Sequence, residues 1–265
     1  MEMIRTKLDA LKKLAEKMGG NADACQTNAE AIDVIAESVG GGGDSATEIT
    51  LYVDAANGSD ENDGLTTSTQ FKTMEKAVEE AQKYKHCEIN VTSNISFPNI
   101  EIKGVCDILI TGSSSITLTG SFEIMKGARV AVQNVTVHNA EPTINNDFAI
   151  KVNTGGHLLL LGGCTISIAE HNYGRVCVRL DIDTTLVCNV VKFGGAPNSS
   201  IINGSGPNCI LNLYKITNNT TNSAKCVSLG IGAICYIWND TEITYTANAK
   251  SLVYYNGVQT HPTTT

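Results

Sequence analysis

The sequence lacks several features that would assign it to a familiar functional class. It has no cluster of Lys and Arg, and its 19 basic against 27 acidic residues give a net charge of −8, so nucleic acid is not an expected partner. It has no run of 18 apolar residues, so no membrane-spanning helix is predicted. The first residues, MEMIRTKLDALKK, lack the apolar segment of a signal peptide, and we expect synthesis in a cytoplasm.

Motifs for metals and cofactors are also missing. The nine cysteines include no C-x-x-C pair, so no zinc site is predicted, and an odd number without an export signal does not suggest a disulfide framework. No phosphate loop, Ser/His/Asp set or nucleophilic Cys motif is visible, and no cofactor is predicted. Six cysteines lie within apolar runs such as VCV, LVCNVV and AICYI, and we expect them to be small buried hydrophobes: Cys164, Cys177, Cys188, Cys209, Cys226 and Cys235.

What the sequence does contain begins with a helical leader. Apolar or small residues recur through residues 1–39 in alternating steps of four and three, from Ile4 to Val39, which is a heptad pattern. Gly19 and Gly20 interrupt it, so one helix and two helices are both compatible. Such a leader can fold on itself as a hairpin, or it can serve oligomerisation or attachment. GGGGD follows, and residues 40–49 are expected to be a flexible linker.

The rest of the chain repeats with a period of about 25 residues. One series of short apolar runs is centred at Ile150, Cys177, Ile202, Cys226 and Leu252, and a second passes through Val130, Leu158, Leu186, Cys209 and Ala233. Two series with one period indicate a solenoid. Each coil would hold short strands with alternating inward and outward residues, for example inward Val130, Val132, Val135 and Val137 with Asn134 at a corner. The sequence therefore predicts an all-β chain in which residues 87–265 form a right-handed parallel β-helix, with coils to about residue 255, and a C-terminal tail.

Two other folds fit the sequence less well than the β-helix does. A leucine-rich repeat would need helical stretches and an L-x-x-L-x-L pattern, and neither is present. A β-sandwich would need hairpin turns and would show no fixed period.

Residues 50–86 are predicted to cap the first coil, because a solenoid end exposes unpaired strand edges. They read as a strand, a turn-rich loop and an amphipathic helix over residues 71–84. The apolar stripe of that helix contains Phe71, Met74, Ala77, Val78 and Ala81.

LYVDAANGSDENDGLTTSTQFKTMEKAVEEA, residues 51–81, resembles the first segment of pectin-lyase-like right-handed β-helix proteins, and residues 1–43 resemble leaders of phage and prophage appendage proteins. The resemblance implies a phage virion protein of tail fibre, tailspike or head fibre type. It further implies a homotrimer attached to the virion through residues 1–39, with host attachment through surface polysaccharide. A bacterial surface adhesin is disfavoured, because no export signal or anchor is visible.

Enzymes of this fold use carboxylates to cleave polysaccharides, and a hydrolase needs two, roughly 5–10 Å apart. RLDIDTT would place Asp181 and Asp183 on one side of a strand, about 6–7 Å apart by strand rise. We expect these to be solvated surface residues, and a polysaccharide-depolymerising tailspike remains the alternative function. The coils are lean, with one Trp and no long insertion that would build a groove.

Two further groups are candidates for binding. The loop AEHNYGR offers His171, Tyr173 and Arg175 to a glycan, and Trp238 offers an aromatic ring elsewhere. The turn loop before the capping helix contains three carboxylates that could bind Ca²⁺ but lack EF-hand spacing, so turns alone account for them: Asp54, Asp60 and Asp63.

Overall fold

The computed structural model describes residues 49–143, 146–170, 175–197, 200–219, 225–238, 245–247, 252–255 and 258–260. The chain divides into two compact units, residues 1–47 and residues 48–265. The predicted helical leader lies outside the described residues, as does the predicted linker except for Ile49, which begins strand β1. Within the described part, no helix has the length and apolar character needed to cross a membrane.

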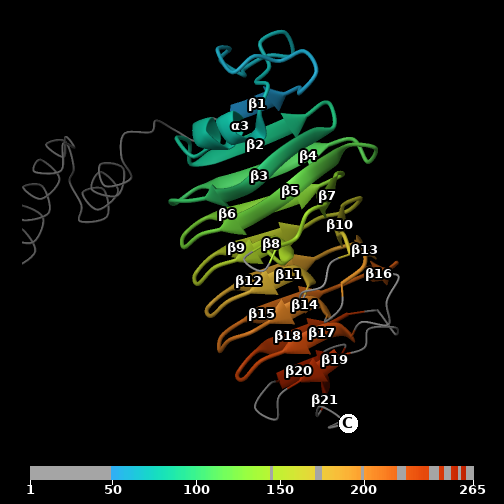
Figure 1. Ribbon diagram of the computed structural model, residues 1–265. Helices are drawn as coiled ribbons and strands as arrows, with labels where there is room; N and C mark the ends of the chain where they lie inside the picture. The colour runs from blue at the N-terminus through green and yellow to red at the C-terminus, as the bar shows by residue number, and fades with distance from the viewer. Residues whose placement is uncertain are drawn as a thin grey trace, which may run out of the picture. The chain divides into compact units, whose positions relative to one another are not determined.

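The second unit is a parallel β-solenoid with about 25 residues in each turn. Figure 1 shows its coils stacked one below another, with the strands arranged in columns. One sheet, here called sheet A, receives one parallel strand from every coil, and its last strand folds back to pair antiparallel with the one before it. In spatial order its strands are β1 (Ile49–Val53), β2 (His86–Val91), β4 (Asp107–Gly112), β6 (Arg129–Gln133), β9 (His157–Leu160), β12 (Thr185–Cys188), β15 (Ile210–Leu213), β18 (Ile234–Ile237), β20 (Leu252–Tyr255) and β21 (Val258–Thr260).

The other sheet, sheet B, begins as one column and continues as two. Its first strands, β3 (Ile95–Ile102) and β5 (Thr117–Ile124), pair with each other. Beyond them, Thr117–Thr119 of β5 pair with β7, while Phe122–Ile124 pair with β8. One arm is β7 (Thr136–Asn139), β10 (Thr165–Ile168), β13 (Val191–Gly195) and β16 (Ile216–Asn218); the other is β8 (Phe148–Val152), β11 (Val176–Leu180), β14 (Ser200–Gly204), β17 (Lys225–Leu229) and β19 (Tyr245–Ala247).

Gly120 lies where β5 divides between the two arms. A Cβ at this position would be 2.4 Å from the carbonyl oxygen of Phe97 and would also overlap the Phe97 ring. Only glycine lets the two strands approach this closely at the bend.

The pairing confirms the predicted period, with one correction. In sheet A, Val130 pairs with Leu158 and Leu158 with Leu186, as the second series requires. In sheet B, Ile150 pairs with Val178, one residue from the predicted centre at Cys177. Leu252 was assigned to the wrong series: it pairs with Ile234 in sheet A, one coil after β18.

The interior is a continuous apolar column. Predicted inward residues Val130, Val132, Val135 and Val137 are buried, and Asn134 turns the chain with a φ of 56°. Of the six cysteines predicted to be buried, five are confirmed as buried free thiols, and the Cys226 side chain lies outside the description.

The capping segment has the predicted order, with a shorter helix. Helix α3 spans Met74–Ala81 rather than residues 71–84. Phe71 instead forms a parallel bridge with Val53, and Thr73 caps the helix by accepting a hydrogen bond from the Lys76 amide (3.2 Å). The predicted stripe from Phe71 to Ala81 is fully buried against the first coil.

Candidate functional site

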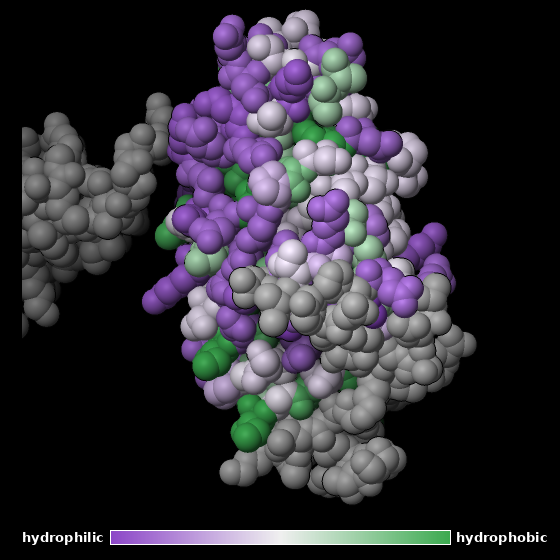
Figure 2. Space-filling view, in the orientation of Figure 1, coloured by the Kyte–Doolittle hydropathy of each residue, from purple (hydrophilic) through white to green (hydrophobic). Residues whose placement is uncertain are grey.

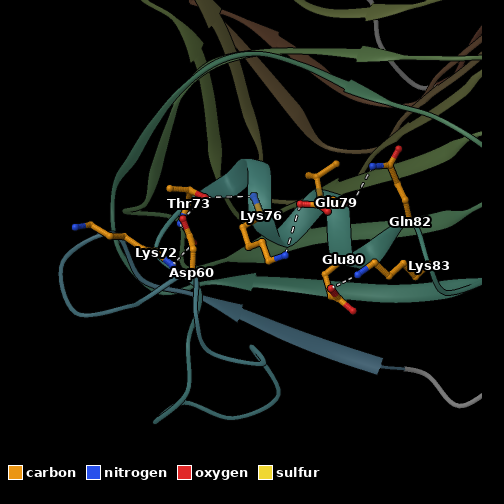
Figure 3. A network of polar contacts seen from close by, with 9 residues as sticks. Asp60, Lys72, Thr73, Lys76, Glu79, Glu80, Gln82 and Lys83 are labelled. Carbon is orange, nitrogen blue, oxygen red and sulfur yellow. Dashed lines mark hydrogen bonds and ion pairs between the residues drawn. The ribbon is translucent and has the colours of Figure 1, made fainter.

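The carboxylate of Asp60 joins the turn loop to the start of α3. Its oxygens accept hydrogen bonds from the backbone N–H groups of Lys72 and Thr73 and from the Thr73 hydroxyl, each at 2.9 Å (Figure 3). Desolvation raises the pKa of Asp60, but the hydrogen bonds from Thr73 and Lys72 outweigh it, so the pKa lies below its ordinary value. Asp60 is therefore an acceptor that fixes the helix N-terminus.

The other two carboxylates of the turn loop are also used within turns. Asp54 accepts from the Asn57 side chain (3.0 Å) and the Ala56 amide (2.9 Å). Asp63 accepts from the Thr69 hydroxyl (2.6 Å) and the Leu65 amide (3.0 Å). Across the described residues, no group of three or more His, Cys, Asp or Glu side chains is placed to hold a metal ion. Turn geometry thus accounts for all three carboxylates.

The structure corrects the placement of Asp181 and Asp183. Strand β11 ends at Leu180, so both residues lie in the turn before β12 and not on a strand. Asp183 adopts a left-handed backbone with φ of 54°, and its carboxylate accepts a hydrogen bond from the Asn208 side chain in the next coil (2.8 Å). Asp183 is exposed and Asp181 partly exposed, so neither is enclosed by the protein as a catalytic acid would be.

The predicted glycan-binding loop is described only at its ends. His171 and Tyr173 lie outside the described residues. Arg175 is only 3% exposed, which leaves little of its side chain for a glycan to contact. Glycan binding by this loop stays a prediction.

Trp238 belongs to an aromatic cluster on the outside of sheet A. Its ring stacks on that of Tyr214 in the preceding coil, with centroids 6.2 Å apart and planes 15° apart. Beside this pair, Tyr236 stacks on Tyr254 at 4.9 Å and 17°. The four aromatic residues come from successive coils around β15, β18 and β20.

The cluster continues an apolar row along the outer face of sheet A. On each strand, buried inward residues alternate with half-buried outward ones, as with Leu158, Leu159 and Leu160. Strand register aligns the middle outward residues in one row, here called the central row. From β4 to β20 it consists of Leu109, Ala131, Leu159, Val187, Asn212, Tyr236 and Tyr254, of which only Asn212 is an amide. On β1 and β2 the same register places the polar residues Thr50 and Glu88.

Exposed hydrophobic side chains gather around the same sheet. Eight large hydrophobic residues are exposed in the described part of the chain, and all but Leu65 lie on sheet A or in the turns that border it. Figure 2 shows hydrophobic residues on the side in view as separate patches among hydrophilic ones. The seven are Val105, Ile182, Val190, Tyr214, Ile231, Leu252 and Val258. We call these seven residues and the central row the sheet A face.

The outward rows of sheet B are polar. On the arm that contains β8 and β11, the row is Glu123, Lys151, Arg179, Asn203 and Ser228. Lys151 pairs with Glu123 (3.5 Å), and Arg179 pairs with Asp147 (2.7 Å). On the arm that contains β7 and β10, one outward row is Thr117, Thr136, Thr165, Lys192 and Thr217. The sheet A face therefore differs chemically from both other sides.

The end of sheet A nearest the capping helix carries ionisable side chains on its outer face. The Asp107 carboxylate lies 3.6 Å from His86 and 3.7 Å from Arg129, on three neighbouring strands. These side chains are partly exposed, so each ion pair contributes little to stability. They give the sheet A face a polar end and an aromatic end.

Sequence reasoning singled out Trp238 but missed its three aromatic neighbours. A usable signal was present, since Tyr214 and Trp238 are one repeat apart and Tyr236 precedes Trp238 by two residues, which places both on the same side of the sheet.

The chain matches no protein-family model, and a search of curated proteins finds none with significant similarity.

Proposed function

We propose that this chain is a structural protein of a phage virion appendage, of the tail fibre, tailspike or head fibre type. It assembles as a homotrimer in the host cytoplasm and joins the virion through residues 1–39. The observation that carries the proposal is the capping segment. Its sequence resembles the first segment of pectin-lyase-like β-helix proteins, a fold common in phage tailspikes, and here its strand, turn loop and helix lead directly into a parallel β-solenoid.

The chemistry of the interior supports assembly in a reducing compartment. The seven cysteines whose side chains are described are free and buried. Desolvation raises the pKa of the Cys87, Cys164, Cys177 and Cys235 thiols to about 12. Such thiols remain protonated and slow to oxidise, so they serve as small apolar packing groups.

The alternative function, polysaccharide cleavage, gains no support from the carboxylates proposed for it. Asp183 is held by Asn208 at a solvent-exposed corner, and Asp181 lies in the same turn. A retaining or inverting mechanism needs one carboxyl group kept protonated by burial. We therefore favour a structural role.

Immunogold electron microscopy tests the proposal. Antibodies are raised against the purified chain and applied to phage particles released by prophage induction from the bacterium that carries the gene. We expect gold label at one class of appendage, and competition by excess purified chain should remove it. Particles that remain unlabelled, while the same antibodies detect the chain in the cell lysate, would contradict a virion location.

A further inference from the structure

We propose that the sheet A face is the surface through which copies of this chain bind one another. This inference rests on the proposed homotrimer and names the surface that forms it. Two observations carry it: exposed hydrophobic side chains concentrate on one of three sides, and strand register aligns the mostly apolar residues of the central row on that side.

The distribution of side chains selects the side. A soluble chain rarely exposes a contiguous apolar patch without a partner for it. Seven of the eight exposed large hydrophobic residues in the described part border or occupy sheet A, and the central row contributes Leu159, Val187 and the two stacked tyrosines. The rows of sheet B carry threonines and paired charges, which water solvates well.

The aromatic geometry favours a protein partner over a sugar. A sugar ring is bound by packing against the open face of an aromatic ring. Tyr236 stacks on Tyr254, and Tyr214 stacks on Trp238, so one face of each ring is turned toward its partner and is not open to a sugar. Tyr and Trp are also the residues enriched in the cores of protein interfaces.

A second copy complements this face at every level. Rotation about an axis parallel to the solenoid brings equal coils together, so aromatic residues meet aromatic residues. At the polar end, Asp107 and Arg129 lie on neighbouring strands, so each copy offers both charges to the other. A second copy of the chain therefore complements both the aromatic end and the charged end of the sheet A face.

The dimensions are sufficient for a stable interface. Six steps between strands separate β4 from β20, which gives roughly 29 Å at 4.8 Å per step. Four-residue strands with a bordering residue on each side give a width of about 20 Å. The face then offers roughly 600 Å² per copy, which a trimer divides between two neighbours, or about 1,800 Å² over the whole assembly.

The first test measures association of the full chain by sedimentation velocity over a range of concentrations. Leu159→Glu places a carboxylate in the central row, whereas Thr165→Glu places the same charge on the outward side of β10 in the same coil. We expect Leu159→Glu to raise the dissociation constant at least about tenfold, because an unpaired carboxylate would be buried at the contact. Thr165→Glu should leave it unchanged.

Cross-linking provides a second measurement that does not depend on a destabilising charge. Val187 lies on β12, the middle one of the seven strands from β4 to β20, so it stays near the contact centre in a parallel or an antiparallel arrangement. With a bismaleimide reagent, Val187→Cys should give covalent dimers and trimers, and Thr165→Cys should give only the wild-type background. The described native thiols are buried and react slowly.

The outcomes separate the two proposals. A wild-type chain that stays monomeric overturns both the homotrimer and the face. A wild-type trimer with unaltered association in Leu159→Glu and no cross-linking of Val187→Cys keeps the homotrimer and overturns the face. Circular dichroism establishes that each variant is folded, and if Leu159→Glu is not, the Val187→Cys cross-linking decides alone.

Discussion

At the scale of single residues, the interior is notable for thiols that stay protonated. Burial raises the pKa of Cys177 to about 12 from an ordinary value of 9.0, and that of Cys209 to about 11. In the unfolded chain the same groups ionise near their ordinary pKa. The folded state therefore holds more protons than the unfolded state at alkaline pH, which links stability to pH.

We expect stability to fall as the pH rises above about 9. The contribution of each thiol is complete below its unfolded pKa and is lost between that value and the raised folded pKa, at about 1.4 kcal/mol per pH unit. Urea unfolding at pH 8 and pH 10 measures the loss. In Cys177→Ala the loss between these pH values should be smaller by about 1.4 kcal/mol; an equal loss in variant and wild type would show that Cys177 does not titrate as described.

Asp60 should show the opposite dependence on pH. Its pKa is lowered, so its contribution is present above the ordinary value of 3.8 and is lost as the pH falls below it. We expect Asp60→Ala to cost about 1–2 kcal/mol at pH 7, because three hydrogen bonds at the start of α3 are removed. The neighbouring Glu61→Ala is the control. Urea unfolding at pH 7 and pH 3 should show a cost that shrinks in acid; a cost independent of pH would argue against the carboxylate.

At the scale of elements, the capping segment depends on one close approach between the turn loop and Phe71. The Gly64 carbonyl accepts a hydrogen bond from the Tyr52 amide (2.8 Å), and its backbone is left-handed with φ of 72°. A Cβ there would lie 2.2 Å from the Phe71 ring, which is itself 1% exposed and unable to move aside. Glycine is thus required both for conformation and for space.

We expect Gly64→Ala to destabilise the solenoid by at least about 2 kcal/mol, through backbone strain and overpacking together. Gly162→Ala is the matched control, because no atom lies within 4 Å of its Cβ position. That variant should stay within about 0.5 kcal/mol of the wild type. Thermal unfolding followed by circular dichroism compares them, and equal melting temperatures would refute the packing described at Phe71.

The period of the coils could be predicted because each coil repeats the same inward positions. Val130, Leu158 and Leu186 are buried one above another, and burial demands an apolar residue at each. The sheet to which a run belongs was harder to predict, because both sheets share one period. Leu252 fits the spacing of one series and lies in the other sheet, since the coil that contains it is shorter than the rest.

The turns were the least predictable part. Asp181 and Asp183 have the i, i+2 spacing of a strand face, yet the left-handed backbone of Asp183 begins a new direction there. Asp and Asn tolerate this conformation, and Asn208 adopts it in the next coil. The aromatic cluster could not be predicted for a different reason. Outward positions accept polar and apolar residues alike, so an outward cluster is recognised only when the register of successive coils is known.

At the scale of the whole molecule, the solenoid presents three sides of unequal chemistry. Two sides belong to sheet B and are polar, whereas sheet A carries a mostly apolar outward row from β4 to β20. In a monomer the apolar side would remain exposed to water, which is unfavourable. In an assembly of several copies the apolar side can be buried while the polar sides remain in water.

We expect the protein to leave bacterial polysaccharides intact, because the two candidate carboxylates are used within a turn. The Asp183 carboxylate is bound by Asn208 at an exposed corner, and its neighbour Asp181 contributes its carbonyl oxygen to the Thr184 hydroxyl (2.8 Å), so both act as turn residues. Purified chain incubated with capsule or wall polysaccharide of the host should not change the length distribution measured by size-exclusion chromatography. Asp181→Ala should behave as the wild type does. Shortening of the polysaccharide by the wild type, and its loss in an Asp181→Ala variant that circular dichroism shows to be folded, would instead establish a depolymerase.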